Sequence, residues 1–137
     1  MPTLGWDAVT VPGAVSGWST LSERFGRLPM RRLVEAASHY AREGFPVSPQ
    51  AAASWHRAVT RYADCPQWQR TFAPDGRAPQ TGERFACPEQ AVTLEAIAES
   101  NGADFYEGDL AERIVAAADA AGAAGAAGAP ASRATRT

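Results

Sequence analysis

The chain has 137 residues, of which 45% are hydrophobic, and it carries a formal net charge of −2. This length and hydrophobic share are typical of one globular domain, and without a basic surplus nothing supports binding to a nucleic acid. No apolar run approaches the roughly 18 residues that a membrane-spanning helix needs, so no membrane span is predicted.

The first third of the chain predicts a short strand and two amphipathic helices. Residues 8–11 have the composition of a brief buried strand, which stops at the Pro-Gly pair that follows. Apolar residues then recur at three- and four-residue steps. We therefore expect one helix that Gly26 ends and a second helix between Pro29 and Gly44. The apolar positions are Trp18, Leu21, Phe25 and Leu28 in the first helix and Met30, Leu33, Val34, Ala37 and Ala41 in the second.

The middle of the chain predicts a third helix and a long turn-rich segment. Ser48 is a capping side chain and Pro49 suits the first helical position, so a helix begins there and ends near residues 64–66. Residues 71–85 are rich in turn residues, and we expect a loop with at most one brief strand. The apolar stripe of the third helix consists of Ala52, Trp55, Val59 and Tyr62.

Two more helices are predicted in the last third. Pro88 suits the first turn of a fourth helix, which residues 101–102 (Asn-Gly) end in a left-handed conformation. Residues 105–106 form a short aromatic turn, and Asp109 caps a fifth helix. The predicted fold is mainly α, with four to five helices and a short leading strand. The apolar positions are Ala91, Leu94, Ile97 and Ala98 in the fourth helix and Leu110, Ile114 and Val115 in the fifth.

The composition changes near the C-terminus, where Ala-Ala-Gly repeats replace the helical pattern. Such small side chains bury too little apolar area to offset the entropy of ordering. We therefore expect residues 1–121 to form one helical segment and residues 122–137 to be a disordered Ala/Gly-rich tail.

His39 stands four residues from both Glu35 and Glu43, so three side chains of metal-ligand type share one helix face. A metal site would need further ligands from another element, and His56, the only other histidine, lies outside this pattern. A solvated face with local charge pairs is the favoured interpretation. We predict no metal site and no cofactor.

Other candidate sites are equally weak. Ser16 lies between glycines but not at the Gly-x-Ser-x-Gly spacing of a nucleophile elbow, so we expect an early helix residue. Cys65 and Cys87 lie far apart and form no metal-type pair; a disulfide between them stays open, with two free thiols favoured. Neither cysteine has the cationic neighbours of an activated thiolate. Gly76 and Gly82 do not form a phosphate-binding loop, because no glycine-rich run precedes a lysine.

The large aromatic residues are candidates either for the core or for an aromatic binding surface. Their helical spacing favours core anchors. They are Trp6, Trp18, Trp55, Trp68, Phe25, Phe45, Phe72, Phe85 and Phe105.

Six blocks of the sequence, in the same order and with similar gaps, resemble segments of the γ-glutamyltransferases (γ-glutamyltranspeptidases). Residues 9–18 are similar to the family's Val-Pro-Gly-x-Val-x-Gly opening segment, and residues 40–47 resemble its Ala-x-x-Gly-Phe-x-Val block. The glycines and prolines of the blocks fall where caps or turns are predicted independently. The other blocks are residues 24–29, 72–79, 94–99 and 105–111, and the six together span roughly residues 5–117.

The resemblance implies a fragment of the large subunit of an N-terminal nucleophile hydrolase, whose helices would flank a four-layer αββα core. Family members transfer the γ-glutamyl group of glutathione-like substrates to water or an amine. Their precursor cuts itself, and the new N-terminal threonine of the small subunit serves as nucleophile and base.

None of the family's catalytic groups maps onto this chain. The arginine that clamps the substrate would lie upstream of Met1, and the oxyanion-hole glycines and nucleophilic threonine would lie downstream of Thr137. We therefore expect no catalytic residue here and no activity of the chain alone.

The two ends of the sequence depart from the family pattern. Residues 1–6 look like the interior of a longer member and show no signal-peptide pattern, so cellular location stays open. The Ala-Gly repeats replace a Leu-rich stretch, and our hypothesis is a truncated or frameshifted reading frame. The alternatives to an enzyme fragment are a helical structural or interaction module and a non-functional truncated product. Self-association through exposed apolar helix faces is a further expectation, because helices draw most of their stability from packing.

Overall fold

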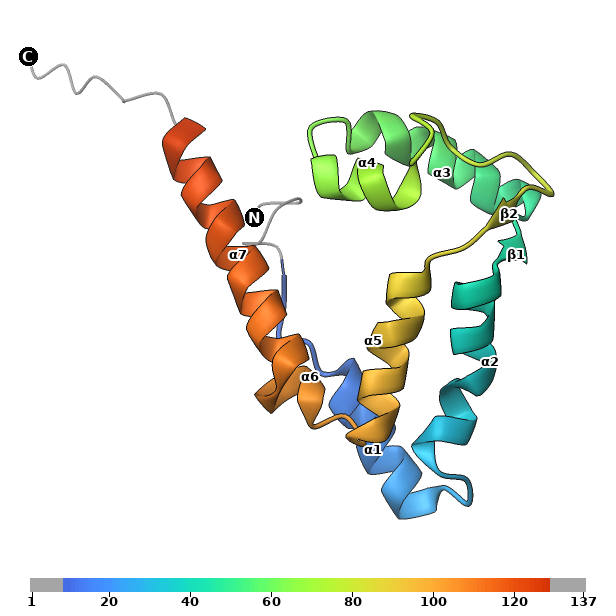
Figure 1. Cartoon of the computed structure of the whole chain (residues 1–137), viewed down its shortest axis with the longest axis vertical. Coiled ribbons are helices and arrows are strands. Elements are labelled where there is room, and N and C mark those ends of the chain that lie inside the picture. The colour runs from blue at the N-terminus through green and yellow to red at the C-terminus, as the bar shows by residue number, and fades with distance from the viewer. Residues whose placement is uncertain (1–8, 129–137) are drawn as a thin grey trace, which may run out of the picture.

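The computed structural model describes residues 9–128, with side chains described to residue 122. Within that range the chain forms seven helices and one sheet of two short strands (Figure 1), so the prediction of a mainly helical fold is confirmed. The helices are α1 (Ala14–Phe25), α2 (Met30–Glu43), α3 (Pro49–Arg61), α4 (Pro66–Phe72), α5 (Pro88–Glu99), α6 (Asp104–Glu107) and α7 (Asp109–Gly128), and the strands are β1 (Phe45–Pro46) and β2 (Arg84–Phe85).

Helix boundaries follow the local signals in the sequence. At the start of α3 the backbone N–H of Ala51 donates to Ser48 Oγ at 3.2 Å, which confirms the predicted cap. After α5, Asn101 and Gly102 take φ angles of 50° and 91°, so this left-handed end is also confirmed. Proline occupies the first turn of α3, α4 and α5.

The predicted leading strand is wrong over the described part of residues 8–11. Residues 9–12 form no strand, and Val9 and Val11 are 61% and 90% exposed. A strand needs a neighbour to satisfy its backbone hydrogen bonds, and this segment has no described strand beside it. The chain instead pairs β1 with β2 in antiparallel fashion, with Phe45 opposite Phe85.

Two helices appear where the sequence predicts only turns. The sequence predicts that residues 64–66 close a helix, but Pro66 opens α4, which has seven residues. It predicts an aromatic turn at residues 105–106, but these residues lie in the four-residue helix α6. Helices this short contain too few residues to display a 3.6-residue apolar period.

The contact between α2 and α5 is the most extensive one between two helices (Figure 1). Ala91 is fully buried, and Ser38 and Ala98 are less than one-tenth exposed. Small side chains let two helix backbones approach closely, which increases dispersion contacts. The N–H of Cys87 also donates to the carbonyl of Ala41 at 2.8 Å, and this bond joins the start of α5 to the end of α2.

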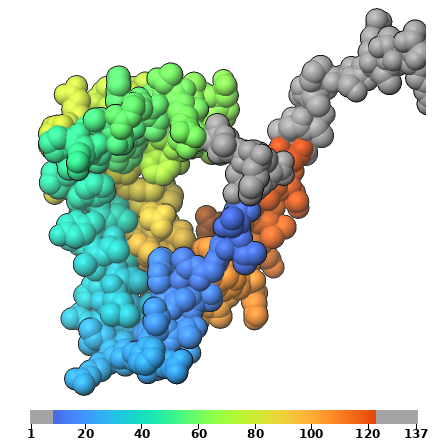
Figure 2. Space-filling model, turned by 180° about the vertical axis from the view of Figure 1, so that it is seen from behind, coloured from blue at the N-terminus to red at the C-terminus, as the bar shows by residue number. Residues whose placement is uncertain are grey.

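The remaining elements add little buried surface to this pair. Val15, Ile97 and Leu110 form a small core where α1, α5 and α7 meet. Among the described residues, Val47 is the largest side chain that is fully buried. Figure 1 shows α7 running away from the α2–α5 pair, with α3 and α4 at the opposite end from α1, and Figure 2 shows an opening below α4. The fold is an open frame, not a closed globule.

Aromatic rings join α3, α4 and β2. The ring centroid of Trp55 lies 4.6 Å from that of Phe85 and 5.9 Å from that of Phe72. Trp68 lies 5.3 Å from Phe72. The rings pack against one another at the distances of favourable aromatic pairs, but all four are only partly buried, so they form an aromatic cluster outside the buried core and not the predicted core anchors.

The same prediction is wrong for two aromatic residues of α1. Trp18 is 47% exposed and Phe25 is 71% exposed. Both follow the helical spacing of a core face, but none of the described elements covers that face. Trp6, which the prediction also includes, lies outside the described residues.

The last helix, α7, continues to Gly128, past residue 122, where the sequence predicts that a disordered tail begins. Residues 129–137 of that tail lie outside the described residues, so their disorder stays a prediction. No helix within the described range is long and apolar enough to cross a bilayer.

The turn at Gly44 provides a test of how the frame is held together. Gly44 has φ 85° and ψ 167°, which only glycine adopts readily, and an added Cβ would lie 2.9 Å from the carbonyl oxygen of Phe85. Gly82 has φ 81°, but an added Cβ meets nothing within 4 Å. We expect Gly82→Ala to cost about 1–2 kcal/mol of unfolding free energy from backbone strain, and Gly44→Ala at least about 1 kcal/mol more. Urea unfolding followed by far-UV circular dichroism measures both, and equal losses would contradict the contact argument.

Candidate functional site

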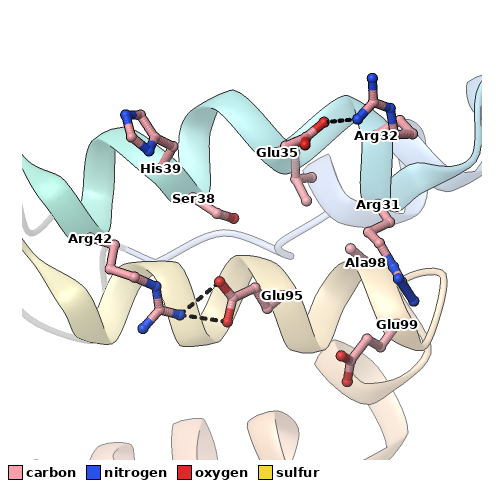
Figure 3. A pocket seen from close by; sticks show the side chains of 10 residues that line it. Arg31, Arg32, Glu35, Ser38, His39, Arg42, Glu95, Ala98 and Glu99 are labelled. Carbon is pink, nitrogen blue, oxygen red and sulfur yellow. Dashed lines mark hydrogen bonds and ion pairs between the residues drawn. The ribbon is translucent and has the colours of Figure 1, made fainter.

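A groove of about 670 Å³ runs along α2 and α5, and Glu35 and His39 of the sequence-predicted candidates line it (Figure 3). Its walls carry the side chains of Arg31, His39 and Arg42 from α2, and of Glu95 and Glu99 from α5. Its volume falls in the range of small-molecule sites, so the chemistry of its walls decides whether it is one.

The clearest polar contact in this groove is an ion pair between the two helices. Nη2 of Arg42 lies 2.7 Å from both carboxylate oxygens of Glu95. The hydrogen bond and the charge of Glu95 raise the pKa of Arg42 above its ordinary value, so the guanidinium stays charged. The two side chains are 47% and 43% exposed, so solvent screens the pair and it contributes little to stability. The pair links α2 to α5 and neutralises both charges.

Ser38 is in the lining of the groove, where α2 packs against α5. Its Oγ is buried and has no hydrogen-bond partner in the described part of the chain. Because this atom has almost no exposed surface, a ligand in the groove cannot reach it. Ser38 therefore acts as a small packing residue of the helix pair.

His39 does not form a ligand set with the two glutamates of its helix. Glu35 pairs with Arg32 on the same helix face, and Glu43 does not line the groove. Figure 3 shows the His39 ring pointing away from α5, whereas Arg42 reaches across to Glu95. In the described range no three Asp, Glu, His or Cys side chains converge on a metal position. The arrangement is a solvated helix face with local charge pairs.

Ser16 lies in the first turn of α1, in the helical position that the sequence predicts. Its Oγ donates to the carbonyl of Gly13 at 2.9 Å, and its N–H donates to Tyr106 Oη at 2.9 Å. The Tyr106 hydroxyl in turn donates to the carbonyl of Pro12 at 2.7 Å. A helix N-terminus leaves backbone N–H groups without partners, and the hydroxyl of α6 satisfies one of them. Ser16 thus belongs to a structural link between α6 and α1.

Both cysteines are free thiols. Cys65 precedes α4 and is exposed, and Cys87 precedes α5. The Cys87 thiol donates to a carboxylate oxygen of Glu89 at 3.9 Å. Its closest charged partner is an anion, whereas an activated thiolate needs a cation beside it.

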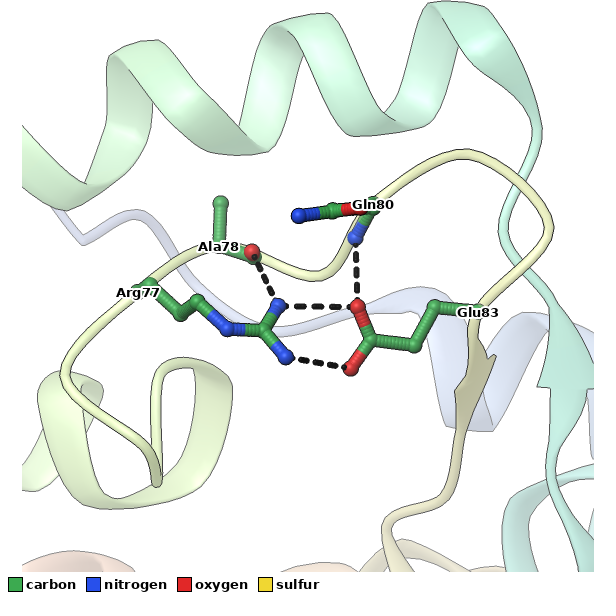
Figure 4. Close-up of polar contacts among 4 residues, drawn as sticks. All are labelled: Arg77, Ala78, Gln80 and Glu83. Carbon is green, nitrogen blue, oxygen red and sulfur yellow. Dashed lines mark hydrogen bonds and ion pairs between the residues drawn. The ribbon is translucent and has the colours of Figure 1, made fainter.

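The loop before β2 is ordered by a second ion pair (Figure 4). Nη1 and Nη2 of Arg77 lie 2.8 and 3.0 Å from the two carboxylate oxygens of Glu83, and the N–H of Gln80 donates to Glu83 at 2.8 Å. The hydrogen bond from Arg77, followed by that from Gln80, lowers the pKa of Glu83 to about 2. The two parallel hydrogen bonds between Arg77 and Glu83 hold the loop in the shape that places β2 beside β1.

The backbone N–H groups of the two glycines in this loop make hydrogen bonds within the protein. The N–H of Gly76 donates to the carbonyl of Ala73, and the N–H of Gly82 donates to the carbonyl of Val47, each at 2.8 Å. A phosphate-binding loop needs amides that point at the ligand without internal partners. These two amides are already occupied.

Five of the grooves along residues 9–128 have no threonine in their lining. The groove beside the Arg77–Glu83 pair measures only about 130 Å³, below the size of a small-molecule site. That the chain lacks catalytic residues stays a prediction.

The lowered pKa of Glu83 makes its contribution to stability depend on pH. A carboxyl whose pKa falls from 4.5 to about 2 on folding stabilises the fold above its unfolded pKa. That contribution is lost as the pH drops through the folded pKa. We expect Glu83→Gln to unfold at lower urea than the wild type at neutral pH, and the two midpoints to converge between about pH 4.5 and pH 2.

Glu35→Gln is the matched control for this experiment. Glu35 and Arg32 are 60% and 62% exposed, and such pairs contribute little to stability. Its midpoint is expected to follow the wild type throughout. A gap between wild type and Glu83→Gln that stays constant down to about pH 2 would show that the Arg77 pair does not stabilise the fold.

Comparison with known proteins assigns the chain to a family. The model of the gamma-glutamyltranspeptidase family matches residues 1–128. The chain is 41% identical over 116 residues to the glutathione hydrolase-like YwrD proenzyme of Bacillus subtilis, a match that covers 84% of this chain and 22% of that protein.

Two solved structures contain the same arrangement of helices. The cephalosporin acylase of Bacillus halodurans matches with a TM-score of 0.85 and 44% identity, over 89% of this chain and 24% of that one. The gamma-glutamyltranspeptidase of Pseudomonas nitroreducens complexed with L-DON matches with a TM-score of 0.79 and 32% identity, over 88% of this chain and 35% of that one.

The chain spans about a fifth of the length of the curated relative and between a quarter and about a third of the two solved chains. The family match extends over nearly all of its 137 residues. The resemblance predicted from the six sequence blocks is thereby confirmed, and the chain belongs to the γ-glutamyltranspeptidase family of N-terminal nucleophile hydrolases, of whose fold it forms a helical segment.

Proposed function

We propose that this chain is the helical part of a γ-glutamyltranspeptidase that transfers the γ-glutamyl group of glutathione-like substrates to water or an amine, and that its 137 residues have no activity by themselves. The observation that carries the proposal is the family match over residues 1–128. It is supported by a helical frame in which five grooves of the described range have no threonine in their lining.

The chemistry of acyl transfer explains why such a segment would be inactive. The reaction needs an activated nucleophile, donors for the developing oxyanion, and a group that holds the substrate carboxylate. Both terminal nitrogens of Arg77 are hydrogen-bonded to the carboxylate of Glu83, and Arg42 is paired with Glu95. An arginine held in this way would have to leave its glutamate before it could bind a substrate carboxylate.

The matching proteins support an acyl-transfer or hydrolysis reaction, but they differ in the substrate that their names give. One solved neighbour is a cephalosporin acylase and another a gamma-glutamyltranspeptidase. The γ-glutamyl assignment for this chain rests on the family match, and its acceptor is left open between water and amines.

A helical interaction module is the second candidate function, and one observation favours it. α1 and α2 expose Leu21 at 60%, Phe25 at 71% and Leu33 at 50%. A contiguous patch of exposed, large apolar side chains often marks a site of interaction with another protein. A stable partner would support this role whether or not the complex is active.

Hydrolysis of a γ-glutamyl anilide tests the proposed inactivity directly. The purified chain is expected to release no aniline above the buffer blank, because the proposal places the nucleophile, the oxyanion donors and the clamp on other polypeptide of the fold. A full-length glutathione hydrolase assayed in parallel is the positive control. Saturable turnover that follows the chain through two chromatographic steps would contradict the proposal.

A further inference from the structure

An apolar groove of about 530 Å³ lies between α1, α2 and α5. Helix α1 contributes Trp18, Leu21 and Phe25 to its lining, and α2 contributes Leu33. These four side chains are between 47% and 71% exposed, so no described element of the chain covers them. Figure 1 shows α1 and the first turns of α2 at the end of the frame opposite α3 and α4, so those two helices leave this face accessible to another molecule.

The groove is free of charge along its described lining. None of the residues that line it is acidic or basic, which distinguishes it from the groove that Arg31 and Arg32 line. The only charged residues of α1 are Glu23 and Arg24, one of each sign. A two-fold contact places the same patch of both copies face to face, so a patch of one charge sign repels its own copy. This patch is neutral and can meet itself without that repulsion.

The apolar residues of α1 also have the spacing of a seam between paired helices. Trp18, Leu21 and Phe25 follow one another at steps of three and four residues, and Leu28 continues the series just after the helix ends. Such a row forms a ridge that packs into the groove between two helices of a partner. Each copy of this chain carries both parts, because the groove between α1 and α2 lies beside the more than half-exposed Leu21 and Phe25.

The exposed apolar area is sufficient for a weak dimer. A fully covered aromatic side chain buries about 150–250 Å², so the four partly exposed side chains offer on the order of 400 Å² per copy. Two copies would bury on the order of 800 Å² from these side chains alone, which is below the roughly 1,200 Å² of stable complexes. We therefore expect a reversible dimer with a Kd in the micromolar range.

We propose that this chain forms a two-fold dimer through the apolar groove, in which Leu21 and Phe25 of each copy pack between α1 and α2 of the other. The driving force is the removal of apolar surface from water. The inference goes beyond the proposed function and does not depend on it, because it uses only the described helices and no property of the reaction.

Analytical ultracentrifugation of the 137-residue chain tests the dimer. Between about 1 and 300 μM, the average mass is expected to rise from one copy to two and then to stay constant, because a two-fold contact occupies the same patch on both copies. Raising the NaCl concentration from about 0.05 to 0.5 M should change the Kd by no more than about twofold, because salt screens charges and none lines the groove.

Paired variants locate the contact. Leu21→Ser with Phe25→Ser is expected to raise the Kd of the dimer at least about tenfold, because the ridge loses its large apolar side chains. Both side chains are exposed in the single chain, so its far-UV circular dichroism should not change. The control is Tyr40→Ser with Val92→Ser, which removes half-exposed apolar side chains outside the groove and should leave the Kd unchanged.

Every other outcome overturns the inference. A chain that stays monomeric at the highest concentration excludes the dimer, and growth beyond two copies excludes a two-fold contact. Equal weakening by the two double variants places the contact outside the groove. A Kd that rises steeply with salt assigns the contact to charged surfaces. Mass is measured without substrate, so a monomeric chain leaves the anilide result intact, and turnover by the chain leaves the dimer result intact.

Discussion

The packing of α2 against α5 is the interaction on which the rest of the frame depends. Ala91, Ala98 and Ser38 bring the two helices close together, and the Arg42–Glu95 pair and the Cys87–Ala41 hydrogen bond align their ends. β1 continues directly from α2, and β2 leads directly into α5. The helices α3 and α4, with their aromatic cluster, therefore lie at one end of this pair and α1 lies at the other (Figure 1).

Beyond that pair the fold is held by separate small contacts. The core of Val15, Ile97 and Leu110 joins α1 and α7 to α5, and the Tyr106 hydroxyl fixes the start of α1. A single large core is absent from the described range. In such a frame the grooves lie between packed helices, and apolar side chains of α1 and α2 stay exposed.

The candidate site residues show how local spacing can suggest chemistry that packing does not support. His39, Glu35 and Glu43 share a helix face at ligand-like spacing, yet a metal needs a second element to supply ligands, and α5 supplies Glu95 to Arg42 instead. Ser16 has glycine neighbours, but its hydroxyl donates to the carbonyl of Gly13 and its backbone N–H donates to the hydroxyl of Tyr106.

The sequence by itself determined the starts of α3 and α5, the end of α5 and the family, because local signals specify them. Ser48, Pro88 and the Asn101–Gly102 pair specify caps through their own backbone and side-chain chemistry, which no distant residue has to complete. Only the tertiary structure decided which apolar residues are buried and which strands pair. Trp18 and Trp55 both have core-like helical spacing, but a neighbouring element covers only Trp55. Residues 9–12 form no strand, whereas residues 45–46 pair with residues 84–85, which the packing of α2 against α5 brings beside them.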